Sequence, residues 1–261
     1  MKIAAYLDDV GDTPDIACQT LQECDIKHVV IRQVWTGNIC DLSDSACQKL
    51  KNIIDKHALS VPMVASNLGL IDCNDLESIP LETINRTLSV AKYFKANYVR
   101  IFGGIKNTSR NKDVINNWMS LISSECVKAG ITPLFEIIDD FPYSYDIPII
   151  LELLNNNRHW RLLYDPVQLI IKRNVNPFDK YWKNIRKFVA AIDVRDYKIG
   201  HGFKIADAGD SMIKQTIDDS KGIGYNGWYF MEFGLGKRIS DGLSKQAIFK
   251  ESYEQFLKIA K

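Results

Sequence analysis

The sequence predicts a (β/α)8 barrel, because eight short apolar segments alternate with eight longer amphipathic segments along the whole chain. The apolar segments are too continuous for a sheet with one face in water, which indicates parallel strands covered by helices. Eight such units normally close into a barrel, and 261 residues match the usual barrel length of about 250. The predicted strands are residues 3–7, 28–32, 60–65, 98–102, 133–138, 161–165, 189–194 and 228–233.

Each predicted strand is followed by a predicted helix. Thr13, Pro14 and Asp15 mark the first helix start, since they supply a capping hydroxyl, a first-turn proline and an acid near the positive helix end. Ser43 and Asp44 open the second helix. The further helices are expected over residues 80–95, 112–129, 147–155, 178–185, 211–220 and 244–260.

We expect one domain spanning residues 1–261, because the chain contains no linker, no low-complexity run and no break in composition. The alternative architecture is an open doubly wound sheet. Such a sheet usually carries a glycine-rich nucleotide-binding turn after its first strand, where this chain reads LDDVGDTPD. The barrel is therefore preferred.

The composition is that of an ordinary globular protein, with 46% hydrophobic and 25% charged residues. A net charge of +1 gives no basic footprint for nucleic acid and no sign of binding to an anionic membrane, so a small molecule is the expected partner. No stretch approaches a transmembrane span, the first residues do not resemble a secretory signal, and the six cysteines show no CxxC spacing. We therefore expect a cytoplasmic protein with reduced thiols.

Carboxylates stand at the ends of four consecutive predicted strands. Glu136 ends the fifth (LFEIIDD), Asp165 the sixth (LLYDP), Asp193 the seventh (AAIDVRD) and Glu232 the eighth (WYFMEFG). Because side chains alternate along a strand, Glu136 shares its face with Leu134. Barrel enzymes carry their active sites at the C-terminal ends of the strands, so we expect the four acids to converge in one mouth.

Four carboxylates in one buried cleft cannot all stay ionised without compensation, because like charges raise one another's pKa and isolated burial is costly. A divalent cation would supply the compensation, and oxygen-only ligands favour Mn²⁺ or Mg²⁺ over zinc. The alternative is a structural role for each acid. Asp165 could cap the loop that begins at Pro166, and Glu232 could pair with Arg195 or Lys237.

Five segments carry a resemblance to a known family. IRQVW (31–35), MVASNLGLI (63–71) and YVRIFGG (98–104) look like the family's second, third and fourth strands. IDVRDYKIGHGFKIADAGD (192–210) is similar to its H-x-K-D … G-x-G-D segment, and GYNGWYFMEFG (224–234) to its GY-x-G … E ending. In their order and spacing, over essentially the whole chain, these segments resemble the xylose isomerase-like TIM barrel superfamily. Its members include sugar phosphate isomerases and epimerases, ketose 3-epimerases, inosose dehydratases, hydroxypyruvate isomerases and endonuclease IV type proteins.

The resemblance implies one divalent metal held by Glu, Asp, His and Glu on strands five to eight. These positions fall on Glu136, Asp165, Asp193 and Glu232, so an aspartate stands where the family has a histidine. The family chemistry is proton transfer at a carbon next to a carbonyl. By resemblance, Glu136 and Glu232 are the catalytic acid and base on opposite sides of a bound sugar, and the metal acts as a Lewis acid.

Two further family positions differ in this sequence. Gln168 replaces a histidine that many members carry three residues after the strand-six Asp, and Val30 replaces a glutamate of the second strand. The site is therefore either an all-oxygen sphere that still works or a degenerate one with weakened metal affinity. His201, in a Gly-flanked loop after strand seven, either supplies the missing imidazole and binds substrate or stays solvated.

Residues near the strand ends complete the predicted pocket. Arg195 lies on the same side of its strand as Asp193, and it either binds substrate oxygens or balances the surplus acid in a salt bridge. Trp35 and Asn67 are expected to bind substrate, with plain packing as the alternative for the aromatic residue. Phe102 and Tyr197 could shape the pocket in the same way.

We therefore expect a divalent-metal-dependent isomerase, epimerase or dehydratase that acts on a sugar, polyol or keto acid. An endonuclease-IV-like phosphodiesterase is disfavoured, because that class needs many histidines and a basic DNA face, whereas this chain has four histidines and a net charge of +1. The remaining alternative is a degenerate, non-catalytic barrel that binds a sugar-like ligand. Barrels of this kind often pair, so a homodimer is the candidate assembly.

Overall fold

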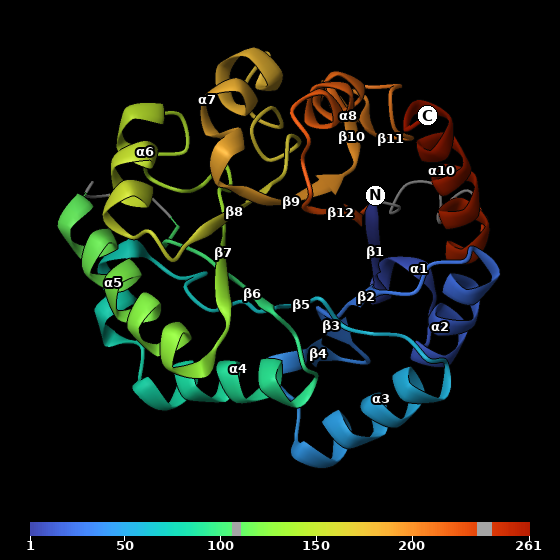
Figure 1. Ribbon diagram of the computed structural model, residues 1–261, viewed down its shortest axis with the longest axis horizontal. Coiled ribbons are helices and arrows are strands. Elements are labelled where there is room, and N and C mark those ends of the chain that lie inside the picture. Colours follow the sequence, from blue (N-terminus) through green and yellow to red (C-terminus); the bar gives the residue numbers. More distant parts are fainter. Residues whose placement is uncertain (106–110, 234–241) are drawn as a thin grey trace.

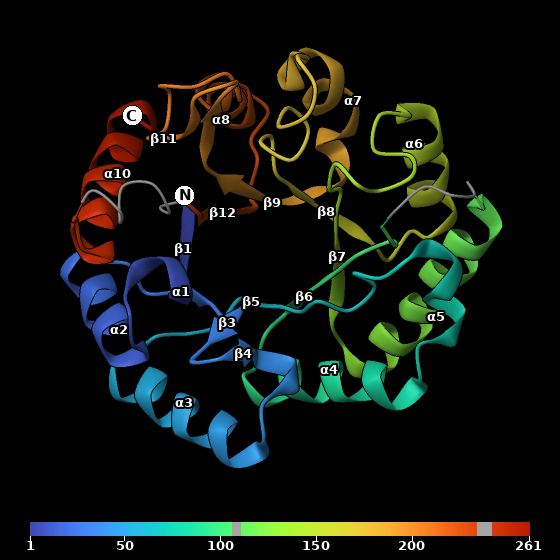
Figure 2. The same cartoon turned by 180° about the vertical axis from the view of Figure 1, so that it is seen from behind.

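The structure is a computed structural model that describes residues 1–105, 111–233 and 242–261. Eight parallel strands form a ring in the order β2-β1-β12-β9-β8-β7-β6-β5, with helices around it (Figure 1, Figure 2). Parallel bridges from His28 to Ser60 and from Ile31 to Val64 join the two edges of this sheet, so the barrel is nearly closed. The strands are β1 (Lys2–Tyr6), β2 (Val29–Val30), β5 (Met63–Ala65), β6 (Tyr98–Ile101), β7 (Thr132–Glu136), β8 (Arg161–Tyr164), β9 (Val189–Val194) and β12 (Trp228–Met231).

The predicted (β/α)8 barrel is confirmed, and helices lie between successive strands of the ring. Thr13 caps α2 by accepting a hydrogen bond from the Ile16 N–H, and Ser43 caps α3 in the same way through the Ala46 N–H. The helices are α1 (Leu7–Val10), α2 (Pro14–Glu23), α3 (Asp44–Lys56), α4 (Leu81–Tyr93), α5 (Lys112–Ala129), α6 (Ile147–Asn156), α7 (Lys183–Ile185), α8 (Ile213–Gly222) and α10 (Lys245–Ile259).

Three features go beyond the predicted elements. The helix expected over residues 178–185 is a π-helical turn, η3 (Phe178–Trp182), that continues into α7. A short antiparallel pair, β3 (Gln33–Val34) and β4 (Gly37–Asn38), follows β2. A second pair, β10 (Asp196–Lys198) and β11 (Gly202–Lys204), follows β9. Both pairs extend from the C-terminal ends of barrel strands, where the site is expected.

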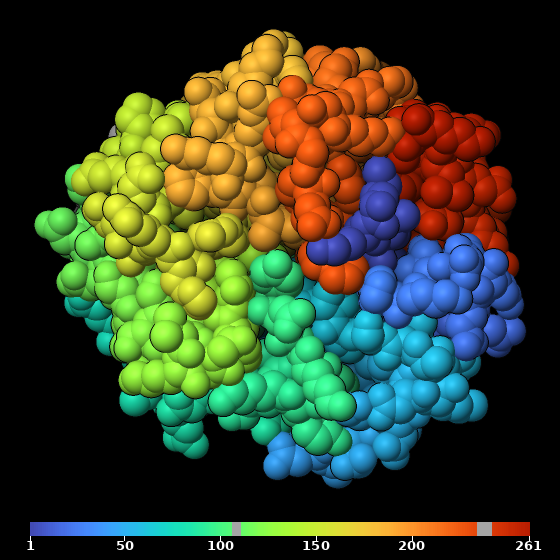
Figure 3. Space-filling model, viewed as in Figure 1, coloured from blue at the N-terminus to red at the C-terminus, as the bar shows by residue number. Residues whose placement is uncertain are grey.

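Strict alternation along the strands separates an inner from an outer core. Leu134 points into the barrel, whereas the adjacent Phe135 packs against the helices. Figure 3 shows the N-terminal residues, in dark blue, at the face where the parallel strands begin, so the strand ends open on the opposite face. The inner core consists of Ala4, Tyr6, Val30, Met63, Ala65, Leu134, Leu163, Ala191 and Phe230.

Two findings bear on the chain's surroundings. Among the helices of the described ranges, none combines the length and the apolar character that crossing a bilayer requires. All six cysteines are free thiols, and burial raises the pKa of Cys18, Cys40 and Cys126 to about 12. These thiols are therefore poor nucleophiles at neutral pH.

Phe230 is the residue whose loss should damage the barrel interior most clearly. Its side chain is fully buried and lies edge-on to Tyr6, with ring centroids 6.2 Å apart. Phe230→Ala should lower the free energy of unfolding by about 3–5 kcal/mol in urea denaturation, because it leaves a cavity in a closed interior. The matched control Val127→Ala, at a side chain that is 60% exposed, should change it by less than about 0.5 kcal/mol. Equal losses in both variants would contradict this packing.

Candidate metal and active site

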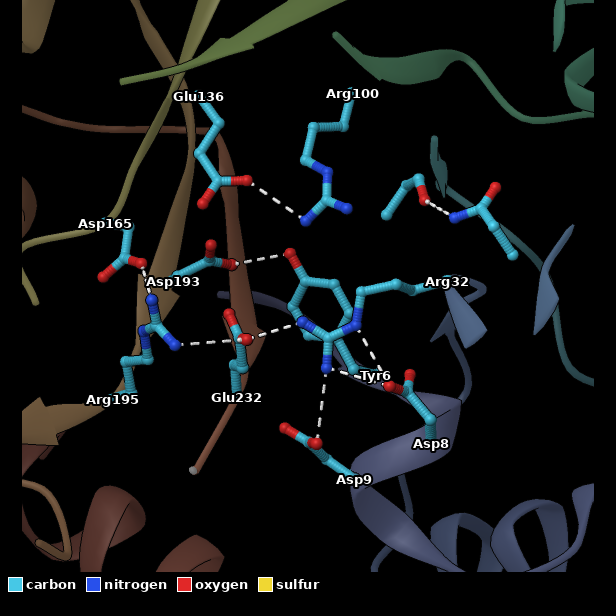
Figure 4. A network of polar contacts seen from close by, with 12 residues as sticks. Tyr6, Asp8, Asp9, Arg32, Arg100, Glu136, Asp165, Asp193, Arg195 and Glu232 are labelled. Carbon is cyan, nitrogen blue, oxygen red and sulfur yellow. Dashed lines mark hydrogen bonds and ion pairs between the residues drawn. The ribbon is translucent and has the colours of Figure 1, made fainter. Parts of the chain in front are cut away.

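Four carboxyls meet at the C-terminal mouth of the barrel, as the sequence predicted (Figure 4). Glu136 is the last residue of β7, Asp165 follows β8, Asp193 lies in β9 and Glu232 follows β12. The inward parity of Leu134 carries Glu136 into the mouth. All four acids are buried, with Asp193 completely inaccessible and Glu232 the most exposed at 7%.

Three of these acids form a compact group that fits a divalent cation. One oxygen each from Glu136, Asp165 and Asp193 lies within 4.8 Å of the others. The Tyr6 hydroxyl donates to Asp193 Oδ1 at 3.0 Å, whereas Asp193 Oδ2 is buried and has no hydrogen-bond partner in the described part of the chain. A buried carboxylate oxygen without a partner is costly. Oxygen donors and an unsatisfied buried oxygen therefore suit Mg²⁺ or Mn²⁺.

The electrostatics of the three-acid group also favour a divalent cation. Burial raises the pKa of Glu136 and of Asp165 above the ordinary carboxyl range, although Arg100 and Arg195 oppose this. Burial and the neighbouring carboxyls raise the pKa of Asp193 furthest. These shifts disfavour the ionised form of the three carboxyls, and a bound divalent ion would oppose them.

Guanidinium groups compensate part of the negative charge of these carboxylates. Two of them, those of Arg32 and Arg100, were not predicted from the sequence. Arg100 donates from Nη1 to Glu136 Oε2 at 3.1 Å, and Arg195 donates from Nη2 to Asp165 Oδ2. Arg32 lies over the Tyr6 ring, with 4.5 Å between the guanidinium carbon and the ring centroid. In Figure 4 these arginines surround the acids from the ends of β2, β6 and β9.

Glu232 is held by arginines rather than by the three-acid group. Arg32 Nη1 donates to its Oε1 at 2.6 Å, and Arg195 Nη1 donates to the same oxygen at 3.3 Å. Burial opposes ionisation, but the two guanidinium groups lower the pKa of Glu232 to about 2. The pairing of Glu232 with Arg195 is thus the one that the sequence left open, while Lys237 lies outside the described residues. The expected capping by Asp165 is also present, through Oδ1 and the Val167 N–H at 2.9 Å.

Two acids that sequence reasoning missed extend the network along α1. Arg32 Nε donates to Asp8 Oδ2 at 3.0 Å, and its Nη2 pairs with Asp9 Oδ1 at 3.4 Å. Burial raises the pKa of Asp9 to about 7 although Arg32 opposes the shift. The signal was present in the sequence, because LDDV follows the first strand directly.

The four predicted substrate-binding residues occupy different places. Arg195 lies in the acid cluster and makes ion pairs there, with 8% of its surface exposed. Trp35 is 44% exposed and lines a cavity of about 400 Å³ together with Asp8 and Asp9. That cavity adjoins the mouth, because Arg32 joins both acids to Glu232.

Asn67 and His201 lie elsewhere. Asn67 is exposed and lines a second cavity, of about 240 Å³, with Ser66 and Thr87. His201 is exposed in the turn between β10 and β11, and among the described residues no hydrogen bond or ion pair joins it to the acid cluster. The solvated alternative for His201 fits this position.

Strand parity is the signal that would have found the missed residues. Arg32 is two residues beyond the inward-facing Val30, and Tyr6 is two beyond the inward-facing Ala4. Arg100 lies in β6, and its guanidinium reaches the same mouth, where it pairs with Glu136.

Comparisons with known proteins identify solved structures that have a similar fold. No family model matches the sequence, and no curated protein matches it. A xylose isomerase-like TIM barrel protein from Mycobacterium smegmatis, in complex with magnesium, is similar with a TM-score of 0.74 and 16% identity over 99% of this chain and 96% of that one. The IolI protein with a bound zinc atom has a TM-score of 0.77 and 12% identity over 100% and 98%. A D-tagatose 3-epimerase-like protein has a TM-score of 0.74 and 13% identity over 100% and 98%.

The chain therefore has the xylose isomerase-like TIM barrel fold, and the resemblance read from the sequence is confirmed at the level of the fold. Asp193, at the position where the resemblance implied a histidine, takes part in the three-acid group. Val30, at the position where the resemblance implied a second-strand glutamate, belongs to the apolar inner core.

Asp193→Asn tests whether ionisation of the buried Asp193 carboxyl lowers the free energy of unfolding of the metal-free protein. Because folding raises the pKa of Asp193, its contribution to stability falls as pH rises above the ordinary carboxyl value near 4. Asparagine cannot ionise, keeps an acceptor for Tyr6 and gains donors toward Glu136 and Asp165. In EDTA at pH 7 the variant should be more stable by about 1–3 kcal/mol in urea denaturation. The gain should shrink at pH 4, and a variant less stable than the parent at both pH values would refute this account.

Proposed function

We propose that the protein is a divalent-metal-dependent isomerase, epimerase or dehydratase that acts on a sugar, polyol or keto acid by proton transfer next to a carbonyl. The observation that carries the proposal is the group of Glu136, Asp165 and Asp193, whose oxygens lie within 4.8 Å of one another at the barrel mouth. Structures of the same fold that hold magnesium or zinc, and one that is epimerase-like, support it.

Glu136, Asp165 and Asp193 would hold the ion, and their hard oxygen donors favour Mn²⁺ or Mg²⁺. When bound, the ion supplies Lewis acidity that polarises a substrate carbonyl. Asp193 here takes the place of the family's histidine, which makes the sphere all-oxygen. Tyr6 orients Asp193 through its hydroxyl and leaves Oδ2 available to the ion.

The two glutamates are suited to different tasks in proton transfer. Burial raises the pKa of Glu136 above its usual value, which is the direction that favours a general acid or base. Arg100 fixes its carboxyl through Oε2 and leaves Oε1 to face the mouth. Glu232, with a pKa of about 2, stays ionised while Arg32 and Arg195 hold it. We therefore assign the first proton transfer to Glu136 and the opposite side of the substrate to Glu232.

The cavity beside the mouth supports a small, polar substrate. Its volume of about 400 Å³ is that of an ordinary ligand pocket. Trp35 offers an aromatic surface for the apolar face of a sugar, while Asp8 and Asp9 offer acceptors for hydroxyls. Lys245, at the start of α10, donates to the Asp8 carbonyl at 3.0 Å and closes one side of the cavity.

A non-catalytic barrel that binds a sugar-like ligand is the second candidate. The observation that favours it is the engagement of Glu232 by Arg32 and Arg195, since a carboxyl with a pKa of about 2 is a weak base at neutral pH. The two candidates differ in a single observable, which is turnover in the presence of metal.

Exchange of substrate C–H hydrogens in D₂O measures that turnover directly. With Mn²⁺ present, a panel of ketoses, inososes and keto acids should include a compound whose proton next to the carbonyl exchanges, followed by NMR. Glu136→Gln should reduce exchange at least about 10²-fold, the usual contribution of a general acid or base. The fold should be kept, as circular dichroism would verify.

Glu152→Gln is the matched control for this experiment. Glu152 lies on α6 and pairs with Lys112 at 2.7 Å on the surface, remote from the mouth. Its exchange rate should equal that of the parent protein. Full exchange in Glu136→Gln would show that the acid–base assignment is wrong, and absence of exchange with the whole panel would favour the non-catalytic candidate.

A further inference from the structure

Arg195 occupies a position that no other cation of the described chain shares. It extends from the end of β9, which lies between β8 and β12 in the sheet. Its Nη2 donates to Asp165 Oδ2 and its Nη1 to Glu232 Oε1, so one guanidinium joins the acids of both neighbouring strands. These acids are two of the four residues expected to hold a metal.

The guanidinium is buried and fixed. Arg195 is 8% exposed, and the Phe203 ring of β11 covers it, with 5.6 Å between the guanidinium carbon and the ring centroid. Its Nε has no hydrogen-bond partner among the described residues. The ion pairs with Asp165 and Glu232 are therefore what compensate its charge at this depth.

A divalent ion would meet this guanidinium at the same carboxyls. Mg²⁺ and Mn²⁺ bind carboxylate oxygens at about 2.0–2.2 Å. An ion held by Asp165 would thus lie within a few ångströms of Arg195, where two positive charges repel strongly in a medium of low polarity. Glu232, which the same guanidinium contacts, is not part of the three-acid group.

We propose that Arg195 is an internal competitor of the metal ion, which holds Asp165 and Glu232 while the site is metal-free and must release them when an ion binds. This inference rests on the proposed metal site, and it concerns what sets the affinity of that site. The competition makes metal binding weaker than the acids alone would allow.

Release of Arg195 would have two effects on the site. Glu232 would become available as a fourth oxygen ligand, as the sequence predicted. The freed N–H groups of Arg195 would face the mouth, where substrate oxygens bind.

Titration with Mn²⁺ tests the competition without any assay of activity. Binding to the full chain is followed by calorimetry and by the electron paramagnetic resonance signal of free Mn²⁺. Arg195→Gln should bind Mn²⁺ at least tenfold more tightly than the parent protein. Mn²⁺ should also raise the Tm of this variant by more than it raises that of the parent, because its metal-free form has lost the ion pairs.

Two control variants separate competition from a general change of charge. Arg186→Gln removes a guanidinium that pairs with Asp219 at 2.6 Å outside the mouth, and its Mn²⁺ affinity should stay within twofold of the parent's. Arg32→Gln removes a cation that contacts Glu232 but no member of the three-acid group. Its gain should be smaller than that of Arg195→Gln, and an equal gain would overturn the proposal.

The remaining outcomes are also decisive. If the parent binds Mn²⁺ and Arg195→Gln binds it no more tightly, the competition is refuted while the metal site stands. If neither protein binds Mn²⁺, the metal site itself is refuted, and the inference with it. Arg195→Lys keeps a buried positive charge but cannot reach both acids, so it serves if the Gln variant does not fold. It should bind at least threefold more tightly, and unchanged affinity would overturn the proposal.

Discussion

The excess of buried carboxyls over guanidinium groups at the barrel mouth is the constraint on which the rest of this site depends. Each arginine satisfies one or more of the acids, yet Asp193 keeps an oxygen without a partner in the described chain. A low-dielectric cleft does not tolerate such an excess unless protons or a cation balance it. The buried acids are Glu136, Asp165, Asp193 and Glu232, and the buried cations are Arg100 and Arg195; Asp8, Asp9 and Arg32 are half-buried beside them.

The barrel scaffold explains why these groups are forced together. Parallel strands end at one face, and alternation sends every second side chain of each strand inward. Below the polar layer, apolar residues such as Leu134 and Phe230 form the buried interior of the barrel. An uncompensated acid such as Asp193 therefore lowers the free energy of unfolding of the whole barrel, a loss that is common at functional sites.

The sequence was sufficient for the strands and for the convergence of the acids, because period-2 alternation and strand order determine both. It was insufficient for the partners. Which guanidinium reaches Glu232 depends on the reach and rotamer of long side chains, and hydrophobic periodicity contains no information on either. Trp35 and His201 lie in turns that follow strands, where parity no longer applies, so their directions could not be predicted. Arg32 and Arg100 could have been found by extending the parity argument to basic residues.

Diffraction from crystals soaked in Mn²⁺ tests the central claim most directly, because the anomalous signal locates the ion independently of any substrate. The account predicts a peak within about 2.2 Å of oxygens from Glu136, Asp165 and Asp193, with Arg195 moved away from Asp165. A map with no peak at the mouth, and with the Arg195–Asp165 and Arg100–Glu136 pairs intact at saturating Mn²⁺, would contradict it.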